Sequence, residues 1–345
     1  MNLKNIGEFN LINAIKKATR RTHGGDRLSI GDDAAAFPIG DNKLCLVTTD
    51  ISIEDVHFDL RYFSLFQAGW KSMTANLSDI AAMGGTPTYG FVSLGVPSSY
   101  TGENIEELYQ GITGIADKYK TEIIGGDTSS ADKLIISITL LGEVSVEGII
   151  PRSGAQRNEA ICVTGDLGKS EAGMKVLREF KMRKKMSKAL PAFLKNEDWE
   201  EVTRAHLEPI PRFAELKAVL EHARPNAMID ISDGLSRDLS HLCQESQKGA
   251  DIYLQRIPVH LDAEKIARLS SMDPIELALH SGEEFELLFT LPRENAAKIC
   301  KEVRMATGTE VTIIGEIKPK TDGINVIGSD GQKRPMKVKG WDHFK

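Results

Sequence analysis

Strand-like and helix-like segments alternate along the first half of the chain, and the alternation begins again after residue 150. The apolar, β-branched runs Leu44–Thr49 and Tyr89–Val96 read as strands. Between them, Ser64–Met83 carries apolar residues at helical spacing. In the second half, the strand-like Ala160–Thr164 is followed by another helix-like segment. This order predicts an α/β or α+β protein in which both halves are folded.

The length of 345 residues fits two domains, given a prior of ~150 residues per domain. We place the boundary near residue 150, which gives an N-terminal domain (1–150) and a C-terminal domain (151–345). No apolar run reaches the ~18 residues that a membrane span needs, and the N-terminus lacks the apolar stretch of a signal peptide. The cysteines contain no CxxC pair, which argues against zinc and favours a reducing, cytoplasmic setting; they are Cys45, Cys162, Cys243 and Cys300.

The net charge of −6 disfavours a protein whose main partner is nucleic acid, because the phosphate backbone requires a basic surface. One basic run, Lys181–Lys188, is compatible with a patch for an anionic ligand. No aromatic residues interleave with its charges, so we interpret it as the solvated face of a helix and the following loop.

Aspartate residues cluster in short motifs that follow or close apolar segments. We expect them at strand ends and in glycine-flanked turns, where a ligand can approach the backbone. If the turns converge, the carboxylates need cations to stay ionised together. Oxygen ligands without a histidine or cysteine cluster select hard ions, and Mg²⁺ bridging to phosphates is the common case. The motifs are Ile30–Ala34, Thr48–Asp50, Asn76–Asp79, Gly125–Thr128 and Asp230–Gly234.

Each motif taken singly is more often a turn or a helix cap than a site. Asp79 is the exception, because an acid late in a helix opposes the macrodipole, and Asn76 shares its helix face. Gly165–Ser170 resembles the end of a P-loop, but its first glycine comes too soon, and we read it as a strand-to-helix turn. The GxGxxG and protein-kinase signatures are absent as well, so any nucleotide is held through metal and scattered backbone contacts.

Taken together, the motifs resemble the thiamine-monophosphate kinase family, within the group that includes aminoimidazole ribonucleotide synthetase and selenophosphate synthetase. This resemblance implies two α/β domains, the first pairing with its copy in a homodimer through strands and the second a sheet covered by helices. It also implies transfer of the γ-phosphoryl group of ATP to thiamine monophosphate, with Mg²⁺ as cofactor. Besides the aspartate motifs, the segments that carry it are His57–Phe58, Arg152–Gly154, Ser281–Leu287 and Gly340–Phe344.

The resemblance assigns roles to individual positions. The catalytic carboxylates would be Asp33, Asp50, Asp79, Asp127, Asp230 and Asp233. The same residues, with Thr48 and Thr49, match the metal-facing positions. The positions that contact ATP match Tyr109, Gly126, Asp127, Arg152 and Ser232, and those that contact the substrate match His57, Glu283 and Trp341.

One segment departs from the family pattern, which is usually Ser-Gly-Gly-Glu-Asp-Tyr-Glu-Leu. Here it reads His280-Ser-Gly-Glu-Glu-Phe-Glu-Leu287, so Glu283 keeps its place while Glu284 and Phe285 replace aspartate and tyrosine. Without the resemblance, His57, Glu283 and Trp341 have ordinary structural readings: a polar slot, a solvated acid and an anchor for the tail.

Three rival functions are weighed against the kinase. A selenide enzyme would want a reactive cysteine near the N-terminus, whereas Cys45 lies in an expected strand. An enzyme acting on a purine intermediate differs in substrate choice, which composition does not decide. A metal-binding protein without transfer activity would need fewer carboxylates than this chain has.

Overall fold

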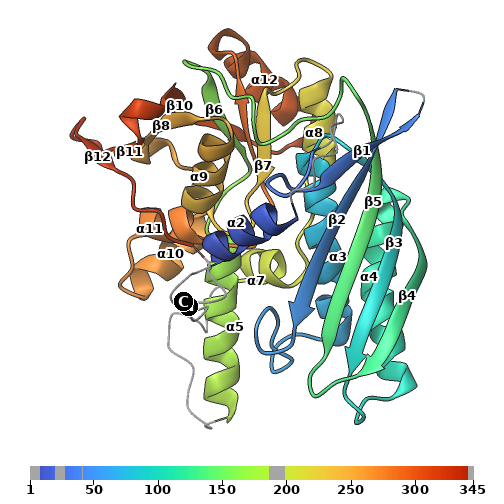
Figure 1. Cartoon of the computed structure of the whole chain (residues 1–345). Helices are drawn as coiled ribbons and strands as arrows, with labels where there is room; N and C mark the ends of the chain where they lie inside the picture. Colours follow the sequence, from blue (N-terminus) through green and yellow to red (C-terminus); the bar gives the residue numbers. More distant parts are fainter. Residues whose placement is uncertain (1–7, 20–27, 41, 186–198, 341–345) are drawn as a thin grey trace.

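The computed structural model describes residues 8–19, 28–40, 42–185 and 199–340, which form two β-sheets and the helices around them (Figure 1). The first sheet has the strand order β1-β2-β5-β3-β4; β3 and β4 are parallel, and the other neighbours are antiparallel. Its strands are β1 (Ala35–Gly40), β2 (Lys43–Ile53), β3 (Thr86–Val96), β4 (Glu122–Ser130) and β5 (Ile135–Ser145).

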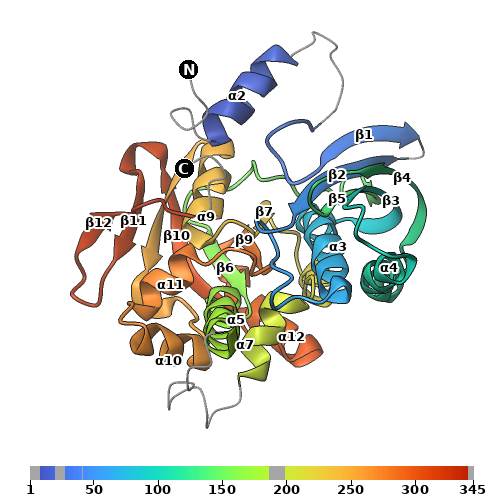
Figure 2. The same ribbon diagram turned by 90° about the horizontal axis from the view of Figure 1, so that it is seen from below.

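Helices α3 (Leu65–Ala82) and α4 (Gly102–Ala116) cover one face of this sheet (Figure 2). Both begin with a capping box, Ser64 with Gln67 in α3 and Thr101 with Asn104 in α4, which satisfies backbone N–H groups that a helix leaves unpaired. The two helices approach so closely that a Cβ on Gly111 would lie 1.8 Å from the Phe66 carbonyl oxygen. Glycine is therefore required at this crossing.

The second sheet has the order β12-β11-β8-β10-β6-β9-β7 and is mostly antiparallel. No described helix has the length and hydrophobicity of a membrane span. The strands of the second sheet are β6 (Ala160–Thr164), β7 (Ala227–Asp230), β8 (Lys248–Tyr253), β9 (Leu287–Leu291), β10 (Val311–Pro319), β11 (Ile324–Ile327) and β12 (Lys333–Pro335). The remaining helices are α2 (Glu8–Ala18), η1 (Asp117–Tyr119), α5 (Lys169–Lys185), α7 (Glu200–Leu207), α8 (Phe213–Leu220), α9 (Leu235–Glu245), η2 (Leu254–Arg256), α10 (Leu261–Leu269), α11 (Pro274–His280), α12 (Arg293–Thr307) and η3 (Lys320–Asp322).

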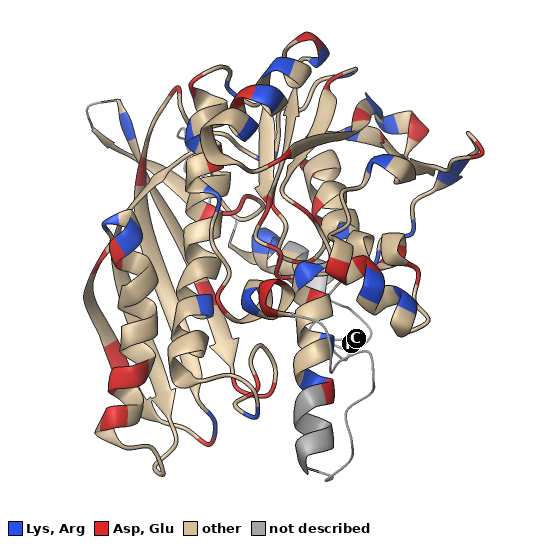
Figure 3. Cartoon of the chain, turned by 180° about the vertical axis from the view of Figure 1, so that it is seen from behind, with Lys and Arg blue, Asp and Glu red and all other residues tan. Residues whose placement is uncertain are grey.

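Helix α3 lies between the two sheets and belongs to the core of both. It packs against β2 and β5 on one side and against β7 on the other. Its last turn places Ala81 and Ala82 in the same apolar cluster as Met228 and Phe289 of the second sheet. Near its other end, Trp70 Nε1 donates to the Pro209 carbonyl oxygen at 2.8 Å. Residues on α3 therefore face the junction of the two halves, where acidic residues, coloured red in Figure 3, lie on the connecting loops.

Two aspartate motifs do not lie where the sequence placed them. Thr48–Asp50 lies inside β2 and Gly125–Thr128 inside β4, so the expectation of strand ends and turns is wrong for both. The reason is that β2 pairs with β5 without interruption from Lys43 to Ile53, and β4 continues along β3 as an exposed edge strand. Polar residues are tolerated in an edge strand because one of its sides faces water.

Candidate active site

Three carboxylates meet where the two halves of the chain join. Asp33 precedes β1, Asp79 lies in the last turn of α3 and Asp230 ends β7. Each offers one oxygen within 4.8 Å of the other two. Asp33 and Asp230 are buried and Asp79 is half-buried. Convergence of three acids from three separate elements is the arrangement expected of a cation site.

Neighbouring hydroxyl groups orient these carboxylates. Thr48 Oγ1 donates to Asp79 Oδ2 at 2.5 Å, and Ser78 Oγ donates to Asp230 Oδ2 at 2.6 Å. Thr48 lies in β2 and Ser78 in α3, so these two acids are held by hydroxyls from the first half of the chain. The remaining oxygen of each acid can then point toward a shared ligand.

The electrostatics of the cluster are those of acids forced together. Burial raises the pKa of Asp50 to about 6, with the hydrogen bond to Asp79 acting in the opposite direction. Burial, followed by the charge of Asp33, raises the pKa of Asp230 to about 8. Burial and the charges of Asp50 and Asp230 raise the pKa of Asp79 well above its usual range. Without a cation, the cluster therefore retains protons near neutral pH.

Arg152 supplies positive charge at the edge of the cluster. Its guanidinium donates to Asp33, and its backbone N–H donates to Asp32 Oδ1 at 2.8 Å. Burial alone would lower the pKa of the Arg152 guanidinium, but the charge and hydrogen bond of Asp33, together with the charges of Asp230 and Asp79, raise it overall. One arginine cannot neutralise Asp33, Asp50, Asp79 and Asp230 together, so most of their negative charge remains to be balanced.

The unpaired oxygens of the cluster fit a hard divalent cation. Asp33 Oδ2 and Asp230 Oδ1 are buried and have no hydrogen-bond donor. Buried polar atoms in native proteins rarely lack partners, and carboxylate oxygens are ligands that Mg²⁺ prefers. The residues present are therefore suited to hold Mg²⁺.

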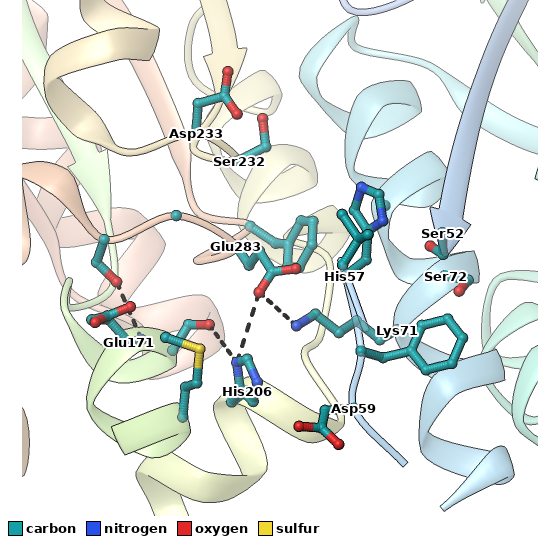
Figure 4. A pocket seen from close by; sticks show the side chains of 18 of the residues that line it. Ser52, His57, Asp59, Lys71, Ser72, Glu171, His206, Ser232, Asp233 and Glu283 are labelled. Atoms are coloured by element: carbon teal, nitrogen blue, oxygen red, sulfur yellow. Dashed lines mark hydrogen bonds and ion pairs between the residues drawn. The ribbon is translucent and has the colours of Figure 1, made fainter. Parts of the chain in front are cut away.

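A cavity of about 850 Å³ opens beside the cluster and is lined by both halves of the chain (Figure 4). Asp50 lines it on the side of the cluster, and Ser232 and Asp233 reach it from the loop after β7. The Ser232 carbonyl oxygen accepts from Glu283 N at 2.7 Å, which ties that loop to the segment before β9. The volume of the cavity is in the range of small-molecule sites.

The structure brings most of the predicted site residues together. The cluster and its rim hold Asp33, Thr48, Asp50, Asp79, Arg152 and Asp230. The cavity is lined by Thr49, Asp50, His57, Ser232, Asp233 and Glu283.

Three predicted site residues lie away from both the cluster and the cavity, and a fourth is not described. Asp127 and Gly126 are exposed in β4, which is separated from β2 by β3 and β5. At ~4.8 Å per strand, Asp127 is roughly 14 Å from the strand that carries Asp50. Tyr109 lies on α4, half-buried against the first core. Trp341 lies outside the described residues.

Sequence reasoning missed Lys71 and His206, which line the cavity beside Glu283 (Figure 4). Lys71, Ala75 and Asp79 are spaced four apart, so they form one stripe on α3 that faces the cavity and the cluster. The sequence did contain a signal for Lys71. It lies at helical spacing from Asp79, the one acid whose position in the helix opposes the macrodipole. His206 carried no such signal.

The residues that depart from the family pattern can be located in the structure. Glu284 is buried and accepts from Gly168 N at 2.9 Å and from Ser281 Oγ. Burial raises its pKa to about 7. Phe285 is buried and lines the cavity, while His280 Nδ1 lies 2.9 Å from Ser236 Oγ. Of the positions that depart from the pattern, His280, Ser281 and Phe285 therefore line the cavity, whereas Glu284 does not.

Comparison with known proteins agrees with this architecture over the whole chain. Residues 31–144 match the family model "AIR synthase related protein, N-terminal domain", and residues 161–327 match the corresponding C-terminal domain. The chain is 34% identical to the thiamine-monophosphate kinase of Bacillus subtilis, covering 99% of this chain and 100% of that protein. It is also 34% identical to the thiamine-monophosphate kinase of Aquifex aeolicus, covering 100% of both. A solved structure, AaThiL complexed with AMPPCP and TMP, superposes with a TM-score of 0.82 at 33% identity, covering 99% of each chain.

Proposed function

The chain belongs to the thiamine-monophosphate kinase family, and from this we infer that it transfers the γ-phosphoryl group of ATP to thiamine monophosphate. Thiamine diphosphate and ADP are the products. The observation that carries this inference is the acidic cluster of Asp33, Asp79 and Asp230, which lies beside a cavity of about 850 Å³ that both halves line. Such a reaction requires a site for cations that bind phosphate groups, beside a cavity that can hold an organic ring system.

The direct test is product analysis with thiamine monophosphate and ATP in the presence of Mg²⁺. We expect ADP release together with thiamine diphosphate, identified by chromatography. Turnover of a purine intermediate in place of thiamine monophosphate would keep the metal centre and overturn the substrate.

We propose that the acidic residues of the cluster and cavity hold Mg²⁺. When bound, Mg²⁺ neutralises charge on two phosphate groups that would otherwise repel each other, and it stabilises the charge of the transition state. Arg152, which is held in place by its ion pair with Asp33, adds a positive charge at the edge of the cluster. The proposed ligands are Asp33, Thr48, Thr49, Asp50, Asp79, Asp230 and Asp233, with Asp127 contributed by a second copy of the chain in the dimer proposed below.

The side chains around the cavity position the reactants and do not take part covalently. A phosphate-monoester oxygen is already anionic at neutral pH, so the attacking group needs no general base. His57 Nδ1 accepts from Ile53 N at 3.0 Å, which places the ring proton on Nε2 as a donor for the substrate phosphate. Ser232 supports the nucleotide phosphates from the other half of the chain. Isolation of a phosphorylated enzyme during turnover would contradict this mechanism.

Stabilisation by ATP is expected to require Mg²⁺. Because the cluster of Asp33, Asp79 and Asp230 repels a polyanion, ATP alone should leave the melting temperature nearly unchanged. With Mg²⁺, ligand at 100 times its dissociation constant adds about 2.7 kcal/mol. Thermal denaturation with ATP, with Mg²⁺ and with both measures this directly. An equal rise with ATP in the presence of a chelator would contradict the proposed site.

We also propose a homodimer formed by the uncovered face of the first sheet. That face exposes large apolar side chains: Ile51, Tyr89, Phe91 and Ile124 are between 38% and 53% exposed. Asp127 pairs in register with Ser93, which alternates with the buried Val92 and Leu94, so it lies on the same face. A second copy seated on this face would bring its own Asp127 toward Thr49, which also projects from this side of β2. In such a dimer, Asp127 of one copy approaches the site of the other copy, whereas within its own chain it lies away from the site.

Mixed dimers test this arrangement. Asp127→Asn and Asp230→Asn homodimers should both be inactive. A heterodimer of the two variants, isolated with two different tags, should recover about half of the wild-type activity, because one of its two symmetric sites receives an intact cluster and an intact Asp127. If Asp127 acted within its own chain, both sites would carry a defect and the heterodimer would be inactive.

Two further proposals concern organisation and location. We propose a domain boundary near residue 150, supported by the end of β5 at Ser145 and the start of β6 at Ala160. We propose a cytoplasmic location, supported by the four cysteines, all of which are free thiols.

A further inference from the structure

Lys71 occupies an unusual place for a lysine. It lies on α3 facing the cavity, and only 7% of its side chain is exposed. Its Nζ donates to Glu283 Oε2 at 2.6 Å and sits 5.3 Å from the centre of the Phe63 ring. Burial lowers the pKa of Lys71, and the charge of Glu283 opposes that effect. Burying a lysine costs free energy, so this ion pair calls for a functional reason.

His206 also lies near Glu283, at 3.8 Å from Nδ1 to Oε2. That distance is too long for a hydrogen bond. Burial, with the charges of Lys71 and Arg178, holds the pKa of His206 well below its usual range, so the ring is neutral. Its Nδ1 instead lies 3.0 Å from Ser170 Oγ. Lys71 therefore provides the charge that balances Glu283 at this end of the cavity.

The backbone that carries Glu283 is fixed and strained. Glu283 has φ 58° and Phe285 has φ 52°, which places both residues in the left-handed region. Their N–H groups donate to Ser232 O at 2.7 Å and to Ile231 O at 2.9 Å. With the main chain held in this way, the direction of the carboxylate depends on what its oxygens bind. Figure 4 shows Glu283 between Lys71 and His206, with its carboxylate in the cavity.

We propose that Lys71 is a positioning and specificity residue, which holds Glu283 Oε2 so that Oε1 is presented to the substrate as a hydrogen-bond acceptor. The proposal rests on the proposed function, in which this cavity receives thiamine monophosphate. As a balanced pair, Lys71 and Glu283 recognise an N–H donor on a ring, such as the pyrimidine amino group, rather than the positive charge of the thiazolium.

The alternative, in which Glu283 attracts the thiazolium cation by charge, predicts the opposite sign. In that case Lys71 competes with the substrate, and removing it leaves a bare carboxylate that binds the cation more tightly. Under our proposal, removing Lys71 frees the carboxylate to turn, and binding weakens.

The experiment compares wild-type protein with Lys71→Met, a change that preserves length and removes the charge. We expect the KM for thiamine monophosphate to rise about 10- to 100-fold, the range for hydrogen bonds to charged groups, while the KM for ATP stays unchanged. Discrimination against the analogue whose pyrimidine amino group is replaced by oxygen should fall by a similar factor. Calorimetric titration with thiamine monophosphate reports the same loss without turnover. The matched control is Lys118→Met, which removes a lysine 4.4 Å from the Trp70 ring and should change none of these values.

An unchanged or lower KM for thiamine monophosphate in Lys71→Met would overturn the inference. Should that variant fold poorly, Glu283→Gln tests the same pair: selectivity for the amino group should be lost, and retained selectivity would overturn the inference. Failure of the wild-type chain to form thiamine diphosphate is a different result and would overturn the proposed function itself.

Discussion

An Asp230→Asn variant is expected to lose catalysis while becoming more stable than the wild type in the absence of metal. Asp230 is buried in the acidic cluster, and its Oδ1 has no hydrogen-bond donor. Asparagine keeps the acceptor for Ser78 but binds Mg²⁺ poorly. Because metal-assisted charge stabilisation is worth several kcal/mol, we expect kcat/KM to fall about 1000-fold.

The stability of the same variant reports on the electrostatics of the cluster. The pKa of Asp230 is raised to about 8, so the folded protein holds a proton that the unfolded chain has released. The contribution of Asp230 to the stability of the metal-free wild type therefore falls as the pH rises from about 4, the ordinary value of an aspartate, to 8. The asparagine side chain of the variant has no proton to lose, so the variant should be the more stable protein at pH 8 in chelator.

Urea unfolding across this pH range and steady-state kinetics measure the two effects. The matched control is Asp322→Asn, which changes an exposed acid in η3 far from the cluster and should alter neither. Near-wild-type turnover by Asp230→Asn would rule out Asp230 as a ligand of the proposed Mg²⁺ site. Lower stability of the variant in chelator at pH 8 would contradict the repulsion between the acids.

The second large effect is expected at Arg212, which holds the acid next to the substrate segment. Arg212 donates to Glu286 through Nε at 2.7 Å and Nη2 at 2.5 Å, and the Glu286 side chain is fully buried. Thr164 Oγ1 donates to the same carboxylate at 2.7 Å. Arg212→Met leaves Glu286 buried without its main partner, and breaking a buried pair in this way costs about 3–5 kcal/mol.

Urea unfolding of Arg212→Met measures this cost as a shift of the midpoint. Arg268→Met is the control, because Arg268 forms a two-pronged contact with Glu264 on the exposed face of α10, where ion pairs contribute little. Adding Glu286→Gln to Arg212→Met should restore part of the stability, since the uncompensated charge is gone. Equal stability of Arg212→Met and wild type would show that Glu286 has other adequate partners.

The sequence predicted the fold well where hydrophobic periodicity was strong. The expected helix Ser64–Met83 is α3 within one residue at each end, and the resemblance to the kinase family identified the two-domain architecture that the family models match. Strand ends were predicted less well, because β2 and β4 continue through polar residues that a neighbouring strand supports by backbone pairing. That support is invisible along a single segment of sequence.

The site residues could be predicted where an acid occupies a position that the local secondary structure disfavours. Asp79 stood out because a helix end disfavours it, and it does lie in the cluster with Asp33 and Asp230. The face on which Asp127 lies could not be predicted, because it depends on the irregularity between Gly90 and Phe91 in the pairing of β3 with β4. A shift of one residue in the register moves a side chain to the other side of a sheet.

Helix α3 limits how this chain can diverge. Fourteen of its 18 residues are buried. The other four are also engaged: Phe66 packs on Trp70, Gln67 donates to Glu208, Ala75 lines the cavity and Asp79 belongs to the cluster. Substitutions at nearly all positions of this helix therefore disturb a core, the cavity or the acidic cluster. Descendants that acquire a new acceptor substrate have more freedom in the loop around Met272, a residue that borders the cavity without belonging to any of the core clusters.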